Sequence, residues 1–194
     1  MLKQEITQAI VQTKTSITLP ILQAFIATES SGKGFDSKTG KILIQFEAHL
    51  FSKATGIARS GANNQHWDEN KVDVQSKEWI AFNEAFSIDP IKAMESTSIG
   101  LPQILGLHWK RLGYESVGAM WDAFKVSEVN QIVGLIKFIE TDKVLYKAIL
   151  DLDFDQIAKS YNGKGYKALA IKLGRVPYDI TMAEFYKKYS SSPK

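Results

Sequence analysis

The chain has 194 residues, of which 44% are hydrophobic and 23% charged, so it is long and apolar enough to bury a packed core. It contains no cysteine, which excludes thiol proteases, cysteine-ligated zinc sites and disulfide scaffolds. A net charge of +3 without a basic stripe argues against a nucleic-acid partner. No linker or internal repeat is visible, so we expect a single domain over residues 1–194, and a monomer.

Apolar residues recur at helical spacing over most of the chain, which predicts a mainly α fold. Helices are predicted at residues 3–13, 19–30, 76–86, 90–96, 116–125, 143–150, 154–161 and 181–189. A further stripe is formed by Val129, Ile132, Val133, Ile136 and Ile139. Asp89 before Pro90 and the spacing of Thr181 and Glu184 are typical of helix starts. No stretch is apolar and long enough to suggest a signal peptide or membrane insertion.

One segment, "FDSKTGKILIQFE", breaks the helical pattern. A Ser-Lys-Thr-Gly turn precedes a β-rich run in which Ile42, Ile44 and Phe46 share one face. We predict a small β-hairpin there, so the fold class is mainly α with a minor β part (α+β). Residues 57–75 are rich in Gly, Asn and Asp and lack apolar period, which predicts a long loop.

Glu29 lies in "FIATESSGKGF", at the end of the predicted helix 19–30. Leu22, Phe25 and Ile26 precede it by seven, four and three residues, so its carboxyl shares their apolar side of the helix. Gly32 is suited to end the helix. An apolar environment and the negative end of the helix dipole both favour a protonated carboxyl, which is what a general acid in glycoside cleavage requires. A buried structural acid is the alternative.

A second, ionised carboxylate would complete a two-carboxylate site, and the predicted hairpin offers Asp36 and Glu47. Glu47 stands on the more polar face of its strand, where water would keep it ionised. A solvated carboxylate without a catalytic role is the alternative for Glu47, and the choice between Asp36 and Glu47 stays open.

Two later stretches carry residues suited to sugar binding. In "STSIGLPQILGLHW", Gln103 follows a Gly-Leu-Pro break where we expect a helix to restart. In "SYNGKGYKAL", Tyr161 offers an aromatic face and Asn162 an amide beside a glycine turn. The same "NGKG" is not taken as a phosphate loop, because it follows a predicted helix and lacks the full motif.

Other chemistries find little support. His49, His66 and His108 are too far apart for a recognised zinc spacing, so no metal and no cofactor is expected. Ser30 and Ser31 lack the Gly-x-Ser-x-Gly elbow of a serine hydrolase, and we expect them to end the helix and line the cleft.

Four blocks together carry a resemblance to a known family. "FIATESSGKGF", "ILIQFEAHLF", "STSIGLPQI" and "SYNGKGY" occur in order between residues 25 and 166. They resemble the helix-end glutamate motif, the Phe-Glu-x-His strand, the Ser-x-Gly-Leu-x-Gln-Ile segment and the Tyr-Asn-Gly loop of the N-acetylmuramidase domain of phage endolysins. This domain is related to lysozymes and lytic transglycosylases.

The resemblance implies a lysozyme-like helical domain with the hairpin beside an active-site cleft, and cleavage of the β-1,4 bond after N-acetylmuramic acid in peptidoglycan. It implies that Glu29 is the catalytic acid and Glu47 the second acidic residue. The implied substrate-binding residues are Ser31, His49, Ser98, Gln103, Tyr161 and Asn162. Glycan strands of peptidoglycan are the expected partner.

Two other functions remain open at this stage. A lytic transglycosylase needs only the acid and leaves 1,6-anhydro ends, and a non-catalytic wall-binding or phage structural protein could use the same fold. Since we find no signal peptide, we expect an endolysin that waits in the cytoplasm until a holin or another export route releases it to the cell wall.

Overall fold

The computed structural model describes residues 2–30, 32–59, 66–71 and 74–191. Its contacts divide the chain into two compact units. Unit 1 is Met1–Gly32 with Ile132–Lys194, and unit 2 is Lys33–Gln131. That the whole chain folds as one domain stays a prediction.

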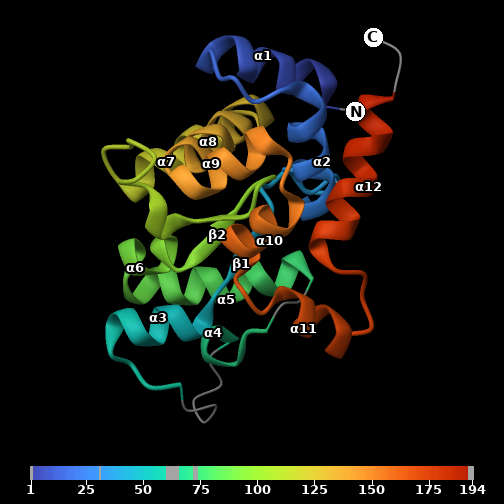
Figure 1. Cartoon of the computed structure of the whole chain (residues 1–194). Helices are drawn as coiled ribbons and strands as arrows, with labels where there is room; N and C mark the ends of the chain where they lie inside the picture. Colours follow the sequence, from blue (N-terminus) through green and yellow to red (C-terminus); the bar gives the residue numbers. More distant parts are fainter. Residues whose placement is uncertain (1, 31, 60–65, 72–73, 192–194) are drawn as a thin grey trace. The chain divides into compact units, whose positions relative to one another are not determined.

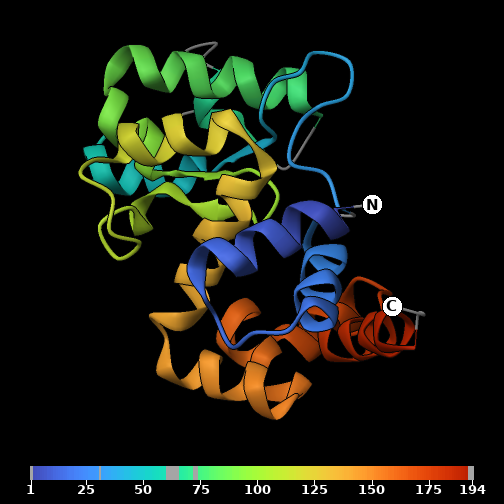
Figure 2. The same ribbon diagram turned by 90° about the horizontal axis from the view of Figure 1, so that it is seen from above.

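Unit 1 is helical throughout its described residues. Its helices are α1 (Lys3–Thr13), α2 (Leu19–Ser30), α9 (Lys143–Asp151), α10 (Phe154–Asn162), α11 (Tyr166–Lys172) and α12 (Tyr178–Ser190), with most of α8 (Glu128–Glu140). Figure 1 shows α12 alongside α2, and Figure 2 shows from above that α1 also lies against α2. Leu22 and Phe25 of α2 are fully buried, so α2 is the central helix of the packing in this unit.

Unit 2 combines short helices with a small sheet. Its helices are α3 (Ala48–Thr55), α4 (His66–Glu69), α5 (Gln75–Ile88), α6 (Pro90–Glu95), α7 (Val117–Val126) and the 3₁₀ helix η1 (Gly106–His108). The strands β1 (Ile44–Phe46), β2 (Thr97–Ile99) and β3 (Ile104–Leu105) form an antiparallel sheet in the order β1-β2-β3. Its register pairs Gln45 with Ser98 and Ser98 with Leu105.

The second edge of β1 is closed by side chains instead of a strand. The Gln75 amide of α5 accepts from the Ile44 N–H and donates to the Ile44 carbonyl, at 2.9 and 2.8 Å. The buried Glu78 carboxylate accepts from the Phe46 N–H at 2.9 Å, and the Asn70 amide donates to the Phe46 carbonyl. The backbone of β1 is therefore satisfied on both edges, as a buried strand requires.

The predicted helices are confirmed within a few residues at their ends. Asp89 caps α6 by accepting a hydrogen bond from the Lys92 N–H. Thr181 does not start a helix: α12 begins three residues earlier, and the Thr181 hydroxyl donates back to the Pro177 carbonyl inside it. The hydroxyl is thus satisfied within the helix, and the capping-box interpretation is wrong.

The predicted buried face of the β segment is confirmed, but the predicted hairpin pairing is wrong for β1. Ile42, Ile44 and Phe46 are all buried. The turn closes with a single antiparallel bridge between Phe35 and Ile42, but β1 pairs with β2, which lies about fifty residues later. A three-residue strand is stabilised more by pairing with a distant strand in the core than by pairing across its own exposed turn.

Another expectation is wrong, and one is corrected in part. No helix restarts at Gln103, which takes a left-handed φ of 48° in the turn between β2 and β3. The predicted loop 57–75 is interrupted by α4, where Trp67 is buried to 1% exposure and its backbone N–H donates to Glu84 at 3.0 Å. Residues 60–65 and 72–73 of the predicted loop lie outside the described residues. One buried tryptophan without apolar period gave no helical signal in the sequence.

Gly106 lets η1 approach α6 closely. A Cβ at this position would lie 2.0 Å from the Met94 carbonyl oxygen, which belongs to the backbone and cannot rotate away. We predict that Gly106→Ala lowers the free energy of unfolding by about 2–3 kcal/mol. Gly118→Ala is the control, because the nearest atom to its Cβ would be the Ser116 hydroxyl at 3.7 Å. It should be neutral or stabilise α7 by up to about 1 kcal/mol. Urea unfolding of both variants checks this, and equal effects would contradict it.

Candidate active site

Glu29 is the penultimate residue of α2. Its Oε1 is buried and, among the described residues, has no hydrogen-bond partner. The residues one and two turns before it, including Phe25 and Leu22, are fully buried. Gly32 follows with a left-handed φ of 78°, which is the conformation expected just after a helix. The sequence pattern thus placed the carboxyl correctly at the buried end of the helix.

Burial raises the pKa of the Glu29 carboxyl from 4.5 to about 7, because the apolar surroundings penalise the charged form. An interaction with the Tyr178 hydroxyl lowers this pKa and is outweighed. Neither Glu29 Oε1 nor the Tyr178 hydroxyl has a hydrogen-bond partner within the described residues, so their interaction is weaker than a well-formed hydrogen bond. A large fraction of Glu29 is therefore protonated at neutral pH, as a general acid must be.

Tyr161 lies near Glu29 at the end of α10. Its ring packs edge-on against Phe25, with centroids 4.6 Å apart, and against Phe138 at 5.7 Å. Burial and the nearby Glu29 charge raise the pKa of its hydroxyl well above 10. Both contacts place the ring in the packing of unit 1. Only the part of the ring outside these contacts is left for a ligand. Asn162, the last residue of α10, is exposed.

A pocket of about 270 Å³ opens beside this group in unit 1. Thr28 precedes Glu29 in the chain and lines the pocket with Asn162 and Tyr178. Burial first, and then the charge of Glu29, raise the pKa of the Tyr178 hydroxyl well above 10. Tyr178 was not predicted from the sequence, since nothing around "RVPYDI" relates it to Glu29 before α12 packs on α2.

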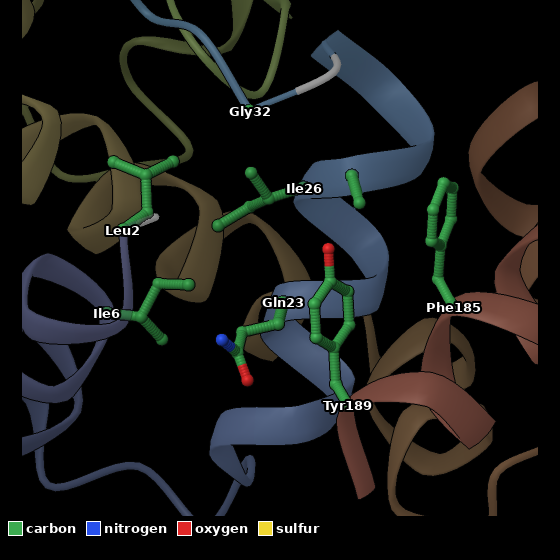
Figure 3. Close-up of a pocket in the computed structure, with 8 residues that line it drawn as sticks. Leu2, Ile6, Gln23, Ile26, Gly32, Phe185 and Tyr189 are labelled. Carbon is green, nitrogen blue, oxygen red and sulfur yellow. The ribbon is translucent and has the colours of Figure 1, made fainter. Parts of the chain in front are cut away.

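A second pocket of about 270 Å³ in unit 1 has a different character. Figure 3 shows Leu2 and Ile6 on one side, Ile26 of α2 between, and the rings of Phe185 and Tyr189 of α12 on the other. None of the described residues that line it is acidic or basic. These residues offer mainly apolar surface.

Unit 2 holds the second candidate carboxylate. Glu47 follows β1 directly and is the N-cap residue of α3, so it stands at the positive end of a helix, whereas Glu29 stands at a negative end. Gln45 donates to Glu47 Oε1 at 2.6 Å, and His49 Nδ1 lies 3.5 Å from Oε2. The structure thus brings Glu47 and His49 together in a polar, partly exposed setting. The strand predicted to reach Glu47 ends at Phe46.

Ser98 lies opposite Gln45 in the sheet, so it shares the half-buried polar face of β1 and β2. Gln103 donates from its amide to the Gly100 carbonyl at 2.8 Å and thus folds onto its own turn. Ser31, the remaining predicted binding residue, lies outside the described residues.

Gln131 fixes the segment that carries Gln103 and was missed by the sequence analysis. Its fully buried amide accepts from the Leu101 N–H at 2.7 Å and donates to the Phe124 carbonyl at 2.9 Å. A Cβ on Gly100 or on Gly34 would collide with this amide, at 2.8 and 2.2 Å. Both glycines, unremarkable in the sequence, therefore leave room for the Gln131 side chain.

Asp36 is occupied by its own turn. Its Oδ1 accepts from the Thr39 N–H at 2.7 Å, the Thr39 hydroxyl and the Lys38 N–H. These bonds, led by Thr39, lower the pKa of this exposed carboxyl. They give Asp36 a structural role, which favours Glu47 as the second candidate carboxylate.

The described residues meet neither the requirements of a metal site nor those of a membrane-spanning helix. His66 pairs with Glu84 at 2.5 Å, which ties α4 to α5. No group of three or more metal-ligating side chains is found among the described residues, and none of the helices described there is long and apolar enough to cross a bilayer.

The comparisons with known proteins decide the family. The family model for N-acetylmuramidase matches residues 18–190. The chain is a member of the N-acetylmuramidase family. Among solved structures, this family member is similar to the crystal structure of Burkholderia AP3 phage endolysin, with 29% identity and a TM-score of 0.79, over 97% of this chain and 70% of that one. No curated protein matches significantly. These findings support a lysozyme-like hydrolase and confirm the resemblance seen in the four sequence blocks.

The raised pKa of Glu29 predicts a pH-dependent stability for this muramidase-family chain. Between pH 4.5 and about 7 the folded state holds a proton that the unfolded state has released, so folding loses stability as pH rises through this window. Glu29→Gln cannot ionise. Its stability relative to the wild type should increase across the window, by up to about 3 kcal/mol above pH 7.

Denaturant unfolding at pH 4.5, 6 and 8 measures this difference. Glu184→Gln makes the same chemical change at an exposed position of α12 and should show no such trend. A stability difference for Glu29→Gln that stays constant over the three pH values would contradict the assignment.

Proposed function

We propose that this chain hydrolyses peptidoglycan as an endolysin, cleaving the β-1,4 bond between N-acetylmuramic acid and N-acetylglucosamine. One observation carries the proposal: a chain of the N-acetylmuramidase family holds a glutamic acid at a buried helix end with a pKa of about 7. The similarity to a phage endolysin supports the biological role.

In the proposed mechanism the protonated Glu29 carboxyl donates its proton to the glycosidic oxygen. The bond from the anomeric carbon to that oxygen breaks, and an oxocarbenium-like charge develops on the muramic acid ring. Glu47 is proposed to activate water or to stabilise this charge, and water completes the hydrolysis. The resemblance of "QFEAH" to the family motif and the partners of Glu47 support its inclusion.

Once Glu29 has given up its proton it carries a charge in an apolar setting. Tyr178 then becomes useful, because its hydroxyl is buried beside Glu29 and has no hydrogen-bond partner among the described residues. A donor that binds the ionised carboxyl more strongly than the neutral one stabilises the product of proton transfer. We therefore assign Tyr178 as a positioning residue for Glu29.

Replacement of Glu29 by Gln should abolish the release of muropeptides from purified peptidoglycan, by at least about 100-fold, because no proton can be donated. Circular dichroism should show an unchanged helical content. Glu184→Gln, exposed on α12, is the matched control and should keep wild-type activity. Near wild-type activity of Glu29→Gln would refute the role of Glu29.

Mass spectrometry of the wild-type products tests the reaction type. Hydrolysis adds one water at each cleaved bond and leaves a reducing end, whereas transglycosylation leaves a 1,6-anhydro end of lower mass. We expect hydrolysis products. Anhydro ends would show that the chain acts as a lytic transglycosylase and not as a hydrolase. Wall binding without either product would favour a non-catalytic protein.

Removal of the Tyr178 hydroxyl should change the pH profile of activity. Because its interaction lowers the pKa of Glu29, Tyr178→Phe should shift the basic limb of kcat/KM upward by about 0.5–1 pH unit and reduce kcat. Tyr146→Phe, on α9, removes a hydroxyl elsewhere in unit 1 and serves as the control. A lower activity with an unshifted limb would mean that Tyr178 has only a packing role.

A further inference from the structure

The pocket lined by Thr28, Asn162 and Tyr178 lies close to the proposed acid and has a second wall from another part of unit 1. Thr28, Asn162 and Tyr178 form its end near Glu29. Its other wall comes from α11 and from the segment that leads to α12. Glu29 itself does not line the pocket, but its chain neighbour Thr28 and its interaction partner Tyr178 do, so a group in this pocket lies close to the proposed acid.

The outer wall of the pocket is apolar and faces water. Leu169, Leu173 and Val176 line it and are 57%, 51% and 61% exposed. Single exposed apolar residues are common on protein surfaces, but several that line one pocket indicate a surface that is covered during function.

Among the described residues that line this pocket, Arg175 is the only charged one. Two nearby lysines are engaged: Lys159 and Lys167 pair with Asp155, and Lys167 also reaches Asp179 at 3.3 Å. Asp155 and Asp179 are thus paired with lysines, and Arg175 takes part in no ion pair among the described residues. Its guanidinium is available to an anion from outside the chain, for which it is the best suited side chain.

We propose that this pocket binds the peptide stem of peptidoglycan, with a stem carboxylate on Arg175 and the small apolar stem side chains on Leu169, Leu173 and Val176. The inference rests on the proposed function. The stem fits because it is anionic, because it contains alanine, and because it is attached through the lactyl group of the muramic acid whose glycosidic bond is cleaved. At about 270 Å³ the pocket has room for a short part of a peptide and not for a folded partner.

Two substrates separate stem binding from sugar binding. One consists of glycan strands that carry their peptide stems, and the other of the same strands after an amidase has removed the stems and left the lactyl carboxylate. Arg175→Gln should raise KM on stem-bearing strands about three- to tenfold, with little change in kcat, and should leave the stripped strands unaffected.

Lys172→Gln is the matched control, because it removes the same charge from exposed α11 without lining the pocket. It should leave KM unchanged on both substrates. Val176→Ser tests the apolar wall and should also raise KM on stem-bearing strands alone, since its side chain is exposed and the fold does not depend on it.

Equal losses for Arg175→Gln on both substrates would overturn the inference, because the pocket would then take the sugar or its lactyl carboxylate. Unchanged kinetics on both would overturn it as well. A wild-type protein that cleaves neither substrate would refute the proposed function and this inference with it, whereas the first two results would leave the proposed function standing.

Discussion

The desolvation of one carboxyl group, that of Glu29, is the physical constraint on which the proposed chemistry depends. Glu29 stands at the end of α2 with its Oε1 buried and unpaired among the described residues, and ionisation there is costly enough to bring its pKa to about 7. Water is excluded from it only because α12 packs along α2 and because Tyr161 of α10 packs against Phe25. The core of unit 1 and the acidity of Glu29 therefore have the same cause. A substitution that loosened the contact between α2 and α12 would lower the pKa of Glu29 as well as the stability.

In unit 2, side-chain hydrogen bonds hold three very short strands in place. Strands of two or three residues gain little from their own pairing. Polar side chains that bond to the backbone compensate for this. Gln75 and the buried Glu78 close the outer edge of β1, and the buried Gln131 bonds to Leu101 and Phe124. These bonds fix the ends of the strands, where Glu47 and Gln103 stand. The side chains that hold these segments are thus Gln75, Glu78 and Gln131. From the sequence alone, residues of these types would be expected on the surface.

The two candidate carboxylates, one in each unit, have different surroundings. Glu29 has a buried Oε1 without a hydrogen-bond partner among the described residues and lies at the negative end of a helix, whereas Glu47 accepts a hydrogen bond from Gln45, lies near His49 and stands at the positive end of α3. The first environment favours a proton donor, and the second surrounds the carboxylate with polar partners. Asp36 lies in neither kind of environment, because its oxygen is committed to a turn. Membership of the N-acetylmuramidase family gives this contrast a chemical meaning, since glycosidic cleavage requires an acid and commonly uses a second carboxylate.

The sequence by itself determined the features that depend on neighbours in the chain. Helical period located most helices, alternation located the buried face of Ile42, Ile44 and Phe46, and the spacing of Leu22, Phe25 and Glu29 placed the acid at a buried helix end. Only the tertiary structure decided what depends on distant contacts. The partner of β1 lies about fifty residues away, and α12 starts at Tyr178 in spite of the helix-start signal at Thr181. Tyr178 and Arg175 line one pocket with Thr28 of α2, and α12 packs on α2. Local patterns report which face of a segment is apolar, but they do not report which other segment will cover that face.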